Sequence, residues 1–319
     1  MLLMSHSGSS QCLTSGANCV ILFGVLSLTG RLVAEERFPI PKTVAPGAEL
    51  VEVYSDPRFF EGPTWDHKTN KLYFTAFAEG NQQIMRLDAP GKATVWLDKT
   101  EGVNGTFLSL DGRLLGAQAY GHRVMSYRIG RKGPIRPKIL AAENTWNQPN
   151  DICQTPNGDI YFTDPDFKNR KTSAVFRLSK RGKVTRVITD MQVPNGLIAS
   201  NDGKTLYVGD SYLKLWRLYP IRPDGSVGGG ALFFDPETED RNSPDGMSID
   251  EQGNLYLSGR GGVWVVSWEC EPLGLIRLPV FCSNVTFGGR DGKTLYMTCS
   301  RKVFSLAMNV RGGQWLRRR

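Results

Sequence analysis

The chain repeats one short pattern six times, and this repeat limits the possible folds more than any other feature. In each copy a polar residue precedes a short apolar stretch, a turn and a second apolar stretch. The interval between copies is 40 to 49 residues, within the range typical of propeller blades. The residues that open the second stretch are Leu72, Leu114, Ile160, Leu206, Leu255 and Leu295.

Four strand-like segments can be recognised in a complete copy, for example residues 197–200, 205–209, 215–219 and 231–234. In most copies an Asn-Gly or Asp-Gly pair joins the first two segments, which is the commonest signal for a tight hairpin. The sequence contains no long amphipathic helical pattern. We therefore expect an all-β protein, and specifically a six-bladed β-propeller.

The last copy supplies three strand segments, 285–287, 294–298 and 302–307, and then the chain ends. Residues 49–54 form a strand-like segment that has no partner in their own repeat. We expect this segment to pair with the last blade and to close the ring. Closure of this kind removes the exposed strand edges that would otherwise favour aggregation.

The first 34 residues differ from the rest. An apolar run at 19–28, followed by residues 32–34 (LVA) with a small-residue cleavage site after Ala34, resembles a secretory signal peptide, although no Lys or Arg precedes the run. We expect cleavage after Ala34, a lead-in at 35–48 and the propeller at 49–319. This interpretation predicts a periplasmic or secreted protein without a stable membrane span in the mature chain. The alternatives are a mis-assigned start, an uncleaved anchor or a disordered tail on a cytoplasmic protein.

Charge and cysteine content exclude some functions. The net charge is +8, but no aromatic-interleaved basic stripe accompanies it, so we expect no nucleic-acid partner. The cysteine spacings do not match those of zinc sites. If the protein is exported, Cys282 and Cys299 could form a disulfide, but buried free thiols are an equal alternative.

A polar residue stands ten or eleven residues before each of the six apolar anchors. Inner strands of propeller blades line a central channel, so equivalent positions should form a ring around one axis. Any one of these residues could simply cap a strand end before glycine. Six of them in register favour a ring of oxygen ligands: Glu61, Asn104, Asn150, Asn195, Asp245 and Asn284.

Part of this ring has the composition of a metal site. Glu61 and Asp245 supply carboxylates, and Asn150 and Asn195 supply amide oxygens. Hard oxygen donors favour Ca²⁺, Mg²⁺ or Mn²⁺ over softer metals, and two carboxylates neutralise a divalent cation. The ring therefore predicts one bound divalent metal ion.

The segments around these residues resemble the signature segments of a known family, that of gluconolactonase, senescence marker protein and the luciferin-regenerating enzyme. The resemblance covers about residues 50–310 and rests on four segments in order: 61–65 (EGPTW), 149–151 (PND), 194–197 (PNGL) and 244–247 (PDGM). It implies a six-bladed propeller that hydrolyses lactones, commonly sugar lactones. It also implies one catalytic divalent metal, most simply Ca²⁺ with Mg²⁺, Mn²⁺ or Zn²⁺ as alternatives, on Glu61, Asn150, Asn195 and Asp245.

Lactone hydrolysis needs a polarised carbonyl and an activated water. A metal can polarise the carbonyl, and Asp245 could act as a general base or attack directly as a nucleophile. Asn104 and His122 are the predicted substrate contacts, although His122 could equally cap a turn. Asp164 could reach the pocket or stabilise a loop, whereas for Asp166 we expect the loop role.

Two other functions remain open. The same metal site could hydrolyse phosphotriesters, organophosphates or aryl esters, and a non-enzymatic propeller could bind a ligand around a structural metal. The chain contains no Gly-x-Ser-x-Gly elbow, which disfavours serine-hydrolase chemistry. We expect a metal-dependent lactonase whose partner is a small-molecule lactone.

Overall fold

The computed structural model describes residues 38–317 except 237, 239 and 241. The chain divides into two units, Met1–Phe38 and Pro39–Arg319, and nearly all described residues belong to the second. The predicted signal peptide, residues 1–34, lies outside the described residues, so export stays a prediction. Within the described part, no helix is long and apolar enough to cross a membrane.

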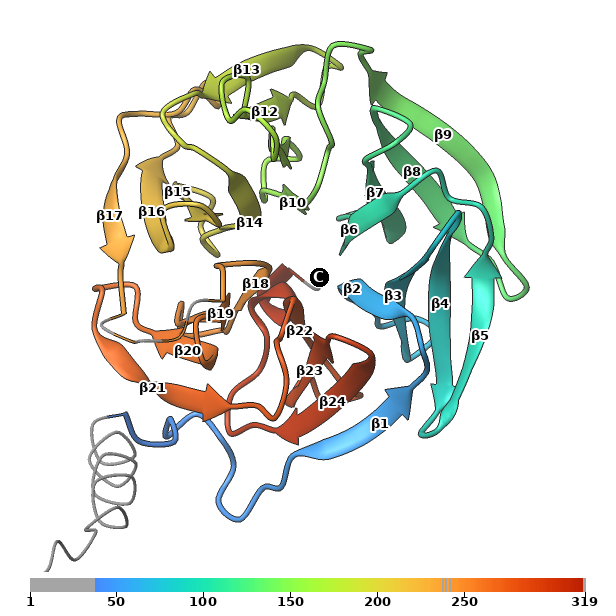
Figure 1. Ribbon diagram of the computed structural model, residues 1–319, viewed down its shortest axis with the longest axis vertical. Helices are drawn as coiled ribbons and strands as arrows, with labels where there is room; N and C mark the ends of the chain where they lie inside the picture. The colour runs from blue at the N-terminus through green and yellow to red at the C-terminus, as the bar shows by residue number, and fades with distance from the viewer. Residues whose placement is uncertain (1–37, 237, 239, 241, 318–319) are drawn as a thin grey trace, which may run out of the picture. The chain divides into compact units, whose positions relative to one another are not determined.

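Six four-stranded antiparallel sheets surround one axis in the second unit (Figure 1). Each sheet begins with an inner strand beside the axis and proceeds outward. The strands of the first three sheets are β2 (Phe59–Asp66), β3 (Lys71–Ala78), β4 (Asn81–Ala89) and β5 (Lys92–Leu97); β6 (Val103–Leu108), β7 (Arg113–Gln118), β8 (Arg123–Ile129) and β9 (Pro134–Ala142); and β10 (Ile152–Gln154), β11 (Ile160–Asp164), β12 (Ala174–Leu178) and β13 (Val184–Ile188).

The next two sheets have the same order. They contain β14 (Pro194–Ala199), β15 (Thr205–Asp210), β16 (Leu215–Pro220) and β17 (Ala231–Phe234), followed by β18 (Met247–Ile249), β19 (Leu255–Gly259), β20 (Gly262–Val266) and β21 (Pro272–Arg277). The predicted six-bladed propeller is thus confirmed.

The sixth sheet is closed by the N-terminal strand. It contains β22 (Asn284–Gly288), β23 (Thr294–Cys299) and β24 (Lys302–Ala307), and its fourth strand is β1 (Val51–Ser55). Val51 lies opposite Ser305, and Ser55 lies opposite Lys302, in antiparallel register. In Figure 1, β1 lies beside β24 at the seam of the ring. The predicted closure is confirmed, with the strand beginning two residues later than expected.

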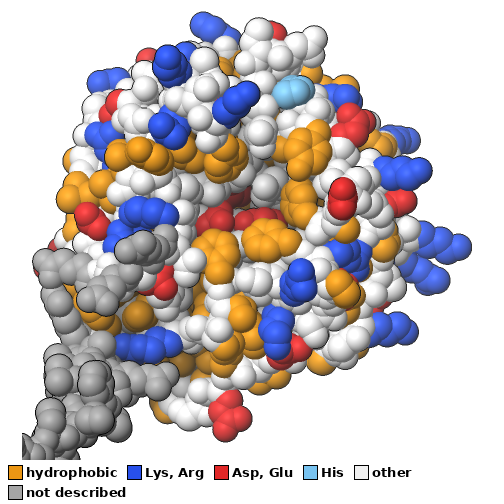
Figure 2. All heavy atoms as spheres, in the orientation of Figure 1, with side chains coloured by type: hydrophobic (Ala, Val, Ile, Leu, Met, Phe, Trp, Pro, Cys, Tyr) orange, Lys and Arg blue, Asp and Glu red, His pale blue; other side chains and the backbone are white. Residues whose placement is uncertain are grey.

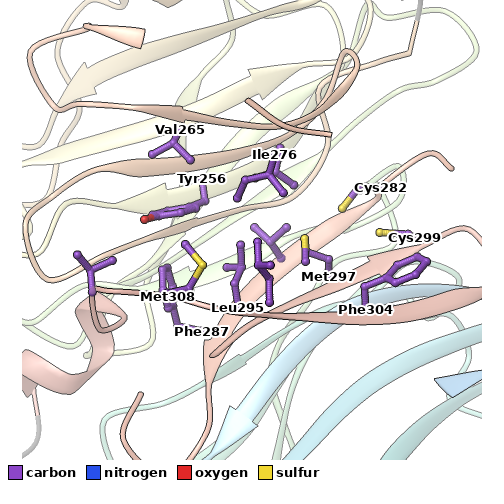
Figure 3. Close-up of a cluster of buried hydrophobic side chains, with 14 residues drawn as sticks. Tyr256, Val265, Ile276, Cys282, Phe287, Leu295, Met297, Cys299, Phe304 and Met308 are labelled. Atoms are coloured by element: carbon purple, nitrogen blue, oxygen red, sulfur yellow. The ribbon is translucent and has the colours of Figure 1, made fainter. Parts of the chain in front are cut away.

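The core consists of apolar side chains packed between adjacent blades. The six anchor residues lie in the second strands and are buried. Figure 3 shows one such interface, where Tyr256 and Val265 of the fifth blade face Phe287 and Leu295 of the sixth. Cys282 and Cys299 belong to the same cluster. All four cysteines of the described part are free thiols: Cys153, Cys282 and Cys299 are buried, as in one of the two expected alternatives, whereas Cys270 is exposed.

The C-terminal segment packs across one end of the central channel. Gln314, in the 3₁₀ helix η1 (Gly313–Arg317), donates a hydrogen bond from Nε2 to the Phe287 carbonyl (2.7 Å). The Trp315 ring contacts His67, with centroids 4.7 Å apart. His67 follows the inner strand of the first blade, so this end of the channel is the one with the turns between first and second strands. The opposite end leads to the polar ring.

Candidate metal and active site

The six predicted ring residues all lie at the start of the inner strands. Glu61, Asn104, Asn195 and Asn284 are within β2, β6, β14 and β22, while Asn150 and Asp245 come two residues before β10 and β18. Figure 2 shows acidic side chains on the floor of a hollow in the middle of this face, with hydrophobic side chains around them. The repeat therefore brings the predicted residues to one place on the axis.

Glycine allows the inner strands to approach the axis this closely. A glycine follows the ring residue in four blades: Gly62, Gly105, Gly196 and Gly246. A Cβ atom at Gly196 would overlap the Asp245 carbonyl oxygen, and one at Gly246 would overlap the Asn284 amide. Each glycine thus makes room for the ring residue of the next blade.

Glu61 is buried and held by neighbouring donors. Its Oε2 accepts hydrogen bonds from the Gly62 N–H (2.8 Å) and from Asn284 Nδ2 (3.3 Å). Ser283 Oγ donates to the Phe60 carbonyl (2.7 Å), which joins the last blade to the first beside this carboxylate. Burial raises the pKa of Glu61 to about 7.

Asp245 faces the same space. Burial raises the pKa of Asp245 well above its ordinary value, and the charges of Glu61 and Asp151 raise it further. Within the described structure neither Glu61 nor Asp245 has an ion-pair partner. Two buried carboxylates that repel each other in this way are an environment suited to a cation.

The Asn195 amide is oriented with its oxygen free. Its Nδ2 donates to Ser211 Oγ (3.0 Å), and Ser211 Oγ donates to the Pro244 carbonyl (2.6 Å). Asn195 Oδ1 is buried and has no hydrogen-bond partner. A buried acceptor without a donor is costly, so this oxygen is well suited to ligate a cation.

Asn150 occupies the equivalent position in the third blade and is also buried. Its N–H donates to the Thr163 carbonyl (2.9 Å), and its carbonyl accepts from the Gly105 N–H (2.7 Å). No group of three or more His, Cys, Asp or Glu side chains in the described part could hold a metal ion by itself. A metal site at the ring would include the asparagine amides, and this mixed oxygen donor set fits a hard cation such as Ca²⁺.

Asp151 is a member of the site that the sequence reasoning missed. It is buried, its Oδ1 accepts the Ile152 N–H (2.9 Å), and burial raises its pKa to about 7. Its charge raises the pKa of both Glu61 and Asp245, so the three carboxyl groups form one electrostatic cluster. Asp151 also lines a small cavity of about 60 Å³ in the channel. One signal in the sequence could have indicated it: the third copy has an aspartate directly after the ring residue, where four other copies have glycine.

Asn104 and His122, the predicted substrate contacts, are placed differently. Asn104 lies in the ring, half-buried, and its carbonyl accepts a hydrogen bond from Thr75 Oγ1 (2.9 Å). His122 lies outside the ring, in the connection between β7 and β8. Its φ is +50°, and its Nδ1 is buried without a hydrogen-bond partner. Neither substrate contact is tested by this geometry, so both stay predictions.

The two aspartates near Pro165 have structural roles. Asp164 accepts hydrogen bonds from the backbone N–H groups of Asn147 (2.9 Å) and Gln148 (2.8 Å), which fixes the segment that leads to Asn150. Burial raises the pKa of Asp164. Asp166 accepts the Asn169 N–H (2.8 Å), in agreement with the expected loop role.

Comparison with known proteins agrees with this architecture. A sequence profile of the family described as "SMP-30/Gluconolactonase/LRE-like region" matches residues 59–301. The chain belongs to this family. Gluconolactonase of Zymomonas mobilis is 30% identical over 292 residues, covering 79% of each chain. Pentonolactonase XacC of Haloferax volcanii is 28% identical and covers 76% of this chain and 81% of its own.

A solved structure is also similar. The gluconolactonase XC5397 of Xanthomonas campestris superposes with a TM-score of 0.72 at 25% identity, covering 85% of this chain and 95% of its own. The family predicted from the four signature segments is therefore confirmed. The family match spans the ring from Glu61 to Asn284.

Proposed function

We propose that this protein opens sugar lactones with the help of one divalent cation held by the ring. It is a lactonase, as the sequence predicted, which is supported by the family and by its gluconolactonase and pentonolactonase relatives. One observation carries the metal-dependent part: two buried, mutually repelling carboxylates converge with the unpartnered Oδ1 of Asn195.

Glu61, Asn150, Asn195 and Asp245 would hold the cation, and Ca²⁺ is the ion that their hard oxygen atoms favour. When bound, such an ion acts as a Lewis acid that polarises the lactone carbonyl. Glu61 contributes charge and is fixed by Gly62 and Asn284. Asn195 contributes an oxygen whose direction is set by Ser211.

Asp245 supplies the second requirement. As a general base, its carboxylate takes a proton from water while the water oxygen bonds to the carbonyl carbon. The ring C–O bond then breaks, and the proton passes to the departing alkoxide, which leaves an open hydroxy acid. As a nucleophile, the carboxylate itself would bond to the carbonyl carbon, the ring C–O bond would break, and the departing alkoxide would take a proton from water. Water or hydroxide would then hydrolyse the mixed anhydride, which releases the open hydroxy acid and regenerates the Asp245 carboxylate. The first route places Asp245 one water molecule away from the reacting carbon, and the second places it at that carbon.

The test is hydrolysis by protein first stripped of metal with a chelator. Glucono-1,5-lactone, a homoserine lactone, an aryl ester and a fluorophosphate are offered with Ca²⁺, Mg²⁺, Mn²⁺ or Zn²⁺, and acid release is followed by pH-stat. We expect the sugar lactone to be hydrolysed fastest and only after metal is restored. Full activity in the stripped protein would refute the metal requirement, and a preference for the fluorophosphate or the aryl ester would refute the substrate class.

A further inference from the structure

The connections between second and third strands divide the mouth of the site into two halves. In blades one, five and six these connections are two-residue turns, at Glu79-Gly80, Arg260-Gly261 and Ser300-Arg301. In blades two, three and four they are longer, at residues 119–122, 165–173 and 211–214. The second half therefore carries the longer connections of this class, which can form a wall above the ring.

Each of the three longer connections presents an aromatic side chain. Tyr120, Phe167 and Tyr212 follow the last residue of their second strand by two or three positions. Their exposed fractions are 57%, 47% and 53%, whereas the aromatic side chains packed between the blades, such as Tyr73, Phe162 and Trp216, are buried. We call these three residues the aromatic arc.

Tyr120 and Tyr212 lie close to ring residues, and Phe167 lies in the equivalent connection of the blade between them. Tyr212 directly follows Ser211, whose hydroxyl accepts the hydrogen bond from Asn195 Nδ2. The Tyr120 ring packs against Gly102, which comes two residues before Asn104. In Figure 2, hydrophobic side chains frame the hollow that has acidic groups on its floor. A molecule that has its reacting carbonyl at the ring and extends toward blades two to four would therefore meet the arc.

The arc is held by ordered contacts. The Asp166 carboxylate accepts hydrogen bonds from the Asn169 N–H (2.8 Å) and Thr172 Oγ1 (3.1 Å), which fixes the connection that carries Phe167. The Arg170 guanidinium lies over the Tyr212 ring, 4.3 Å from its centroid, and links the third blade to the fourth. The connection that carries Phe167 and the Tyr212 ring are thus pre-formed, and the face of Tyr212 that Arg170 does not cover is the one left for a ligand.

We infer that the aromatic arc is a subsite for a second sugar residue, so that the substrate is the lactone of an aldobionic acid, a disaccharide with an oxidised end. This inference rests on the proposed lactonase function. The C–H face of a pyranose packs flat on an aromatic ring while its hydroxyl groups stay in water. Separate, half-exposed aromatic faces among polar residues suit that ligand better than an acyl chain, which needs continuous apolar walls.

The experiment compares kcat/KM for cellobiono-1,5-lactone, glucono-1,5-lactone and an N-acyl homoserine lactone. The variants are Tyr120→Ala, Phe167→Ala and Tyr212→Ala, singly and combined, together with Tyr120→Leu/Tyr212→Leu, which keeps apolar area but removes the flat rings. Trp268→Ala is the matched control, because Trp268 is equally exposed (59%) but lies at the opposite end of the blades, beside Gly253. Thermal unfolding confirms that each variant is folded.

We expect wild type to prefer the disaccharide lactone. The combined alanine variant should lose about tenfold or more in kcat/KM for that lactone, since stacking on each ring contributes modestly. The leucine variant should behave similarly, and glucono-1,5-lactone hydrolysis should change by less than about twofold. Trp268→Ala should leave kcat/KM unchanged for both the disaccharide lactone and glucono-1,5-lactone.

Four outcomes would overturn the inference: preference for the acyl lactone, no hydrolysis of the disaccharide lactone, equal losses on both sugar lactones, or full activity of the leucine variant. If wild type hydrolyses glucono-1,5-lactone but not the disaccharide lactone, the subsite is refuted and the proposed function stands. If it hydrolyses no lactone at all with any metal, the proposed function itself is refuted.

Discussion

The floor of the site consists of the six ring residues, and its mouth consists of the connections between second and third strands. Both come from the same repeat, but the six copies agree more closely in sequence and length at the floor than at the mouth. On the floor, all six copies place a carboxylate or carboxamide at the same point, and four follow it with glycine. At the mouth, the connections range from two-residue turns to the segment 165–173. The floor is constrained by the approach of six strands to one axis, whereas the mouth has solvent around it and can vary. This difference suggests that the floor determines the reaction and the mouth determines the substrate.

The largest effect on kcat should come from substitution of Asp245, the floor residue with the proposed chemical role. Asp245→Asn keeps an oxygen donor of similar size but removes most of the basicity. We expect kcat on glucono-1,5-lactone to fall about 10²- to 10⁴-fold at saturating metal, the usual contribution of general-base catalysis. Full recovery of kcat at high metal concentration would show that Asp245 is only a ligand. Steady-state kinetics over a range of Ca²⁺ concentrations measures this.

Glu61→Gln should separate metal binding from chemistry on the same floor. The substitution removes one of the two charges that attract the cation, so metal affinity should fall by about tenfold or more, with kcat largely restored by added metal. The rise in Tm on adding Ca²⁺ gives a readout that is independent of activity. At 100 times Kd, binding adds about 2.7 kcal/mol of stability. A variant that keeps the wild-type Ca²⁺ midpoint would exclude Glu61 as a ligand.

The close packing of the floor can be tested at a glycine. In Gly196→Ala the new methyl group would overlap the Asp245 carbonyl, so the inner strands must shift. We expect a loss of about 1–3 kcal/mol in the free energy of unfolding, typical of overpacking, together with weaker metal binding. Gly229→Ala is the control, because a Cβ atom there has nothing within 4 Å. Equal unfolding midpoints for the two variants in urea would contradict the packing argument.

The same contrast explains what the sequence could reveal. The blade number and the ring follow from a register that six copies repeat, so each position was supported by five others. The closing strand was predicted because the last copy lacks a fourth strand and the segment at 49–54 lacks a partner. Asp151 was missed because it stands one position after the ring residue, where four other copies have glycine. The repeat therefore gave no support for a functional side chain at that position. The hydrogen bond from Ser283 to the Phe60 carbonyl joins residues 223 positions apart and has no local signal. Gln314 likewise donates to the Phe287 carbonyl, 27 positions before it, without a local signal.

The smallest effect should come from a polar residue at the mouth. His122→Asn preserves a residue that tolerates a φ of +50°, so the turn and the fold should be retained. If His122 only contacts a substrate hydroxyl, the substitution should raise KM about threefold and leave kcat unchanged, since it removes binding that ground state and transition state share. The pH profile of kcat should also be unchanged, because the base is on the floor. A loss of kcat as large as that in Asp245→Asn, with a shifted pH profile, would instead place the base at the mouth. The floor would then be a metal cradle, and the reaction and the substrate would both be determined by the connections that the repeat leaves free to vary.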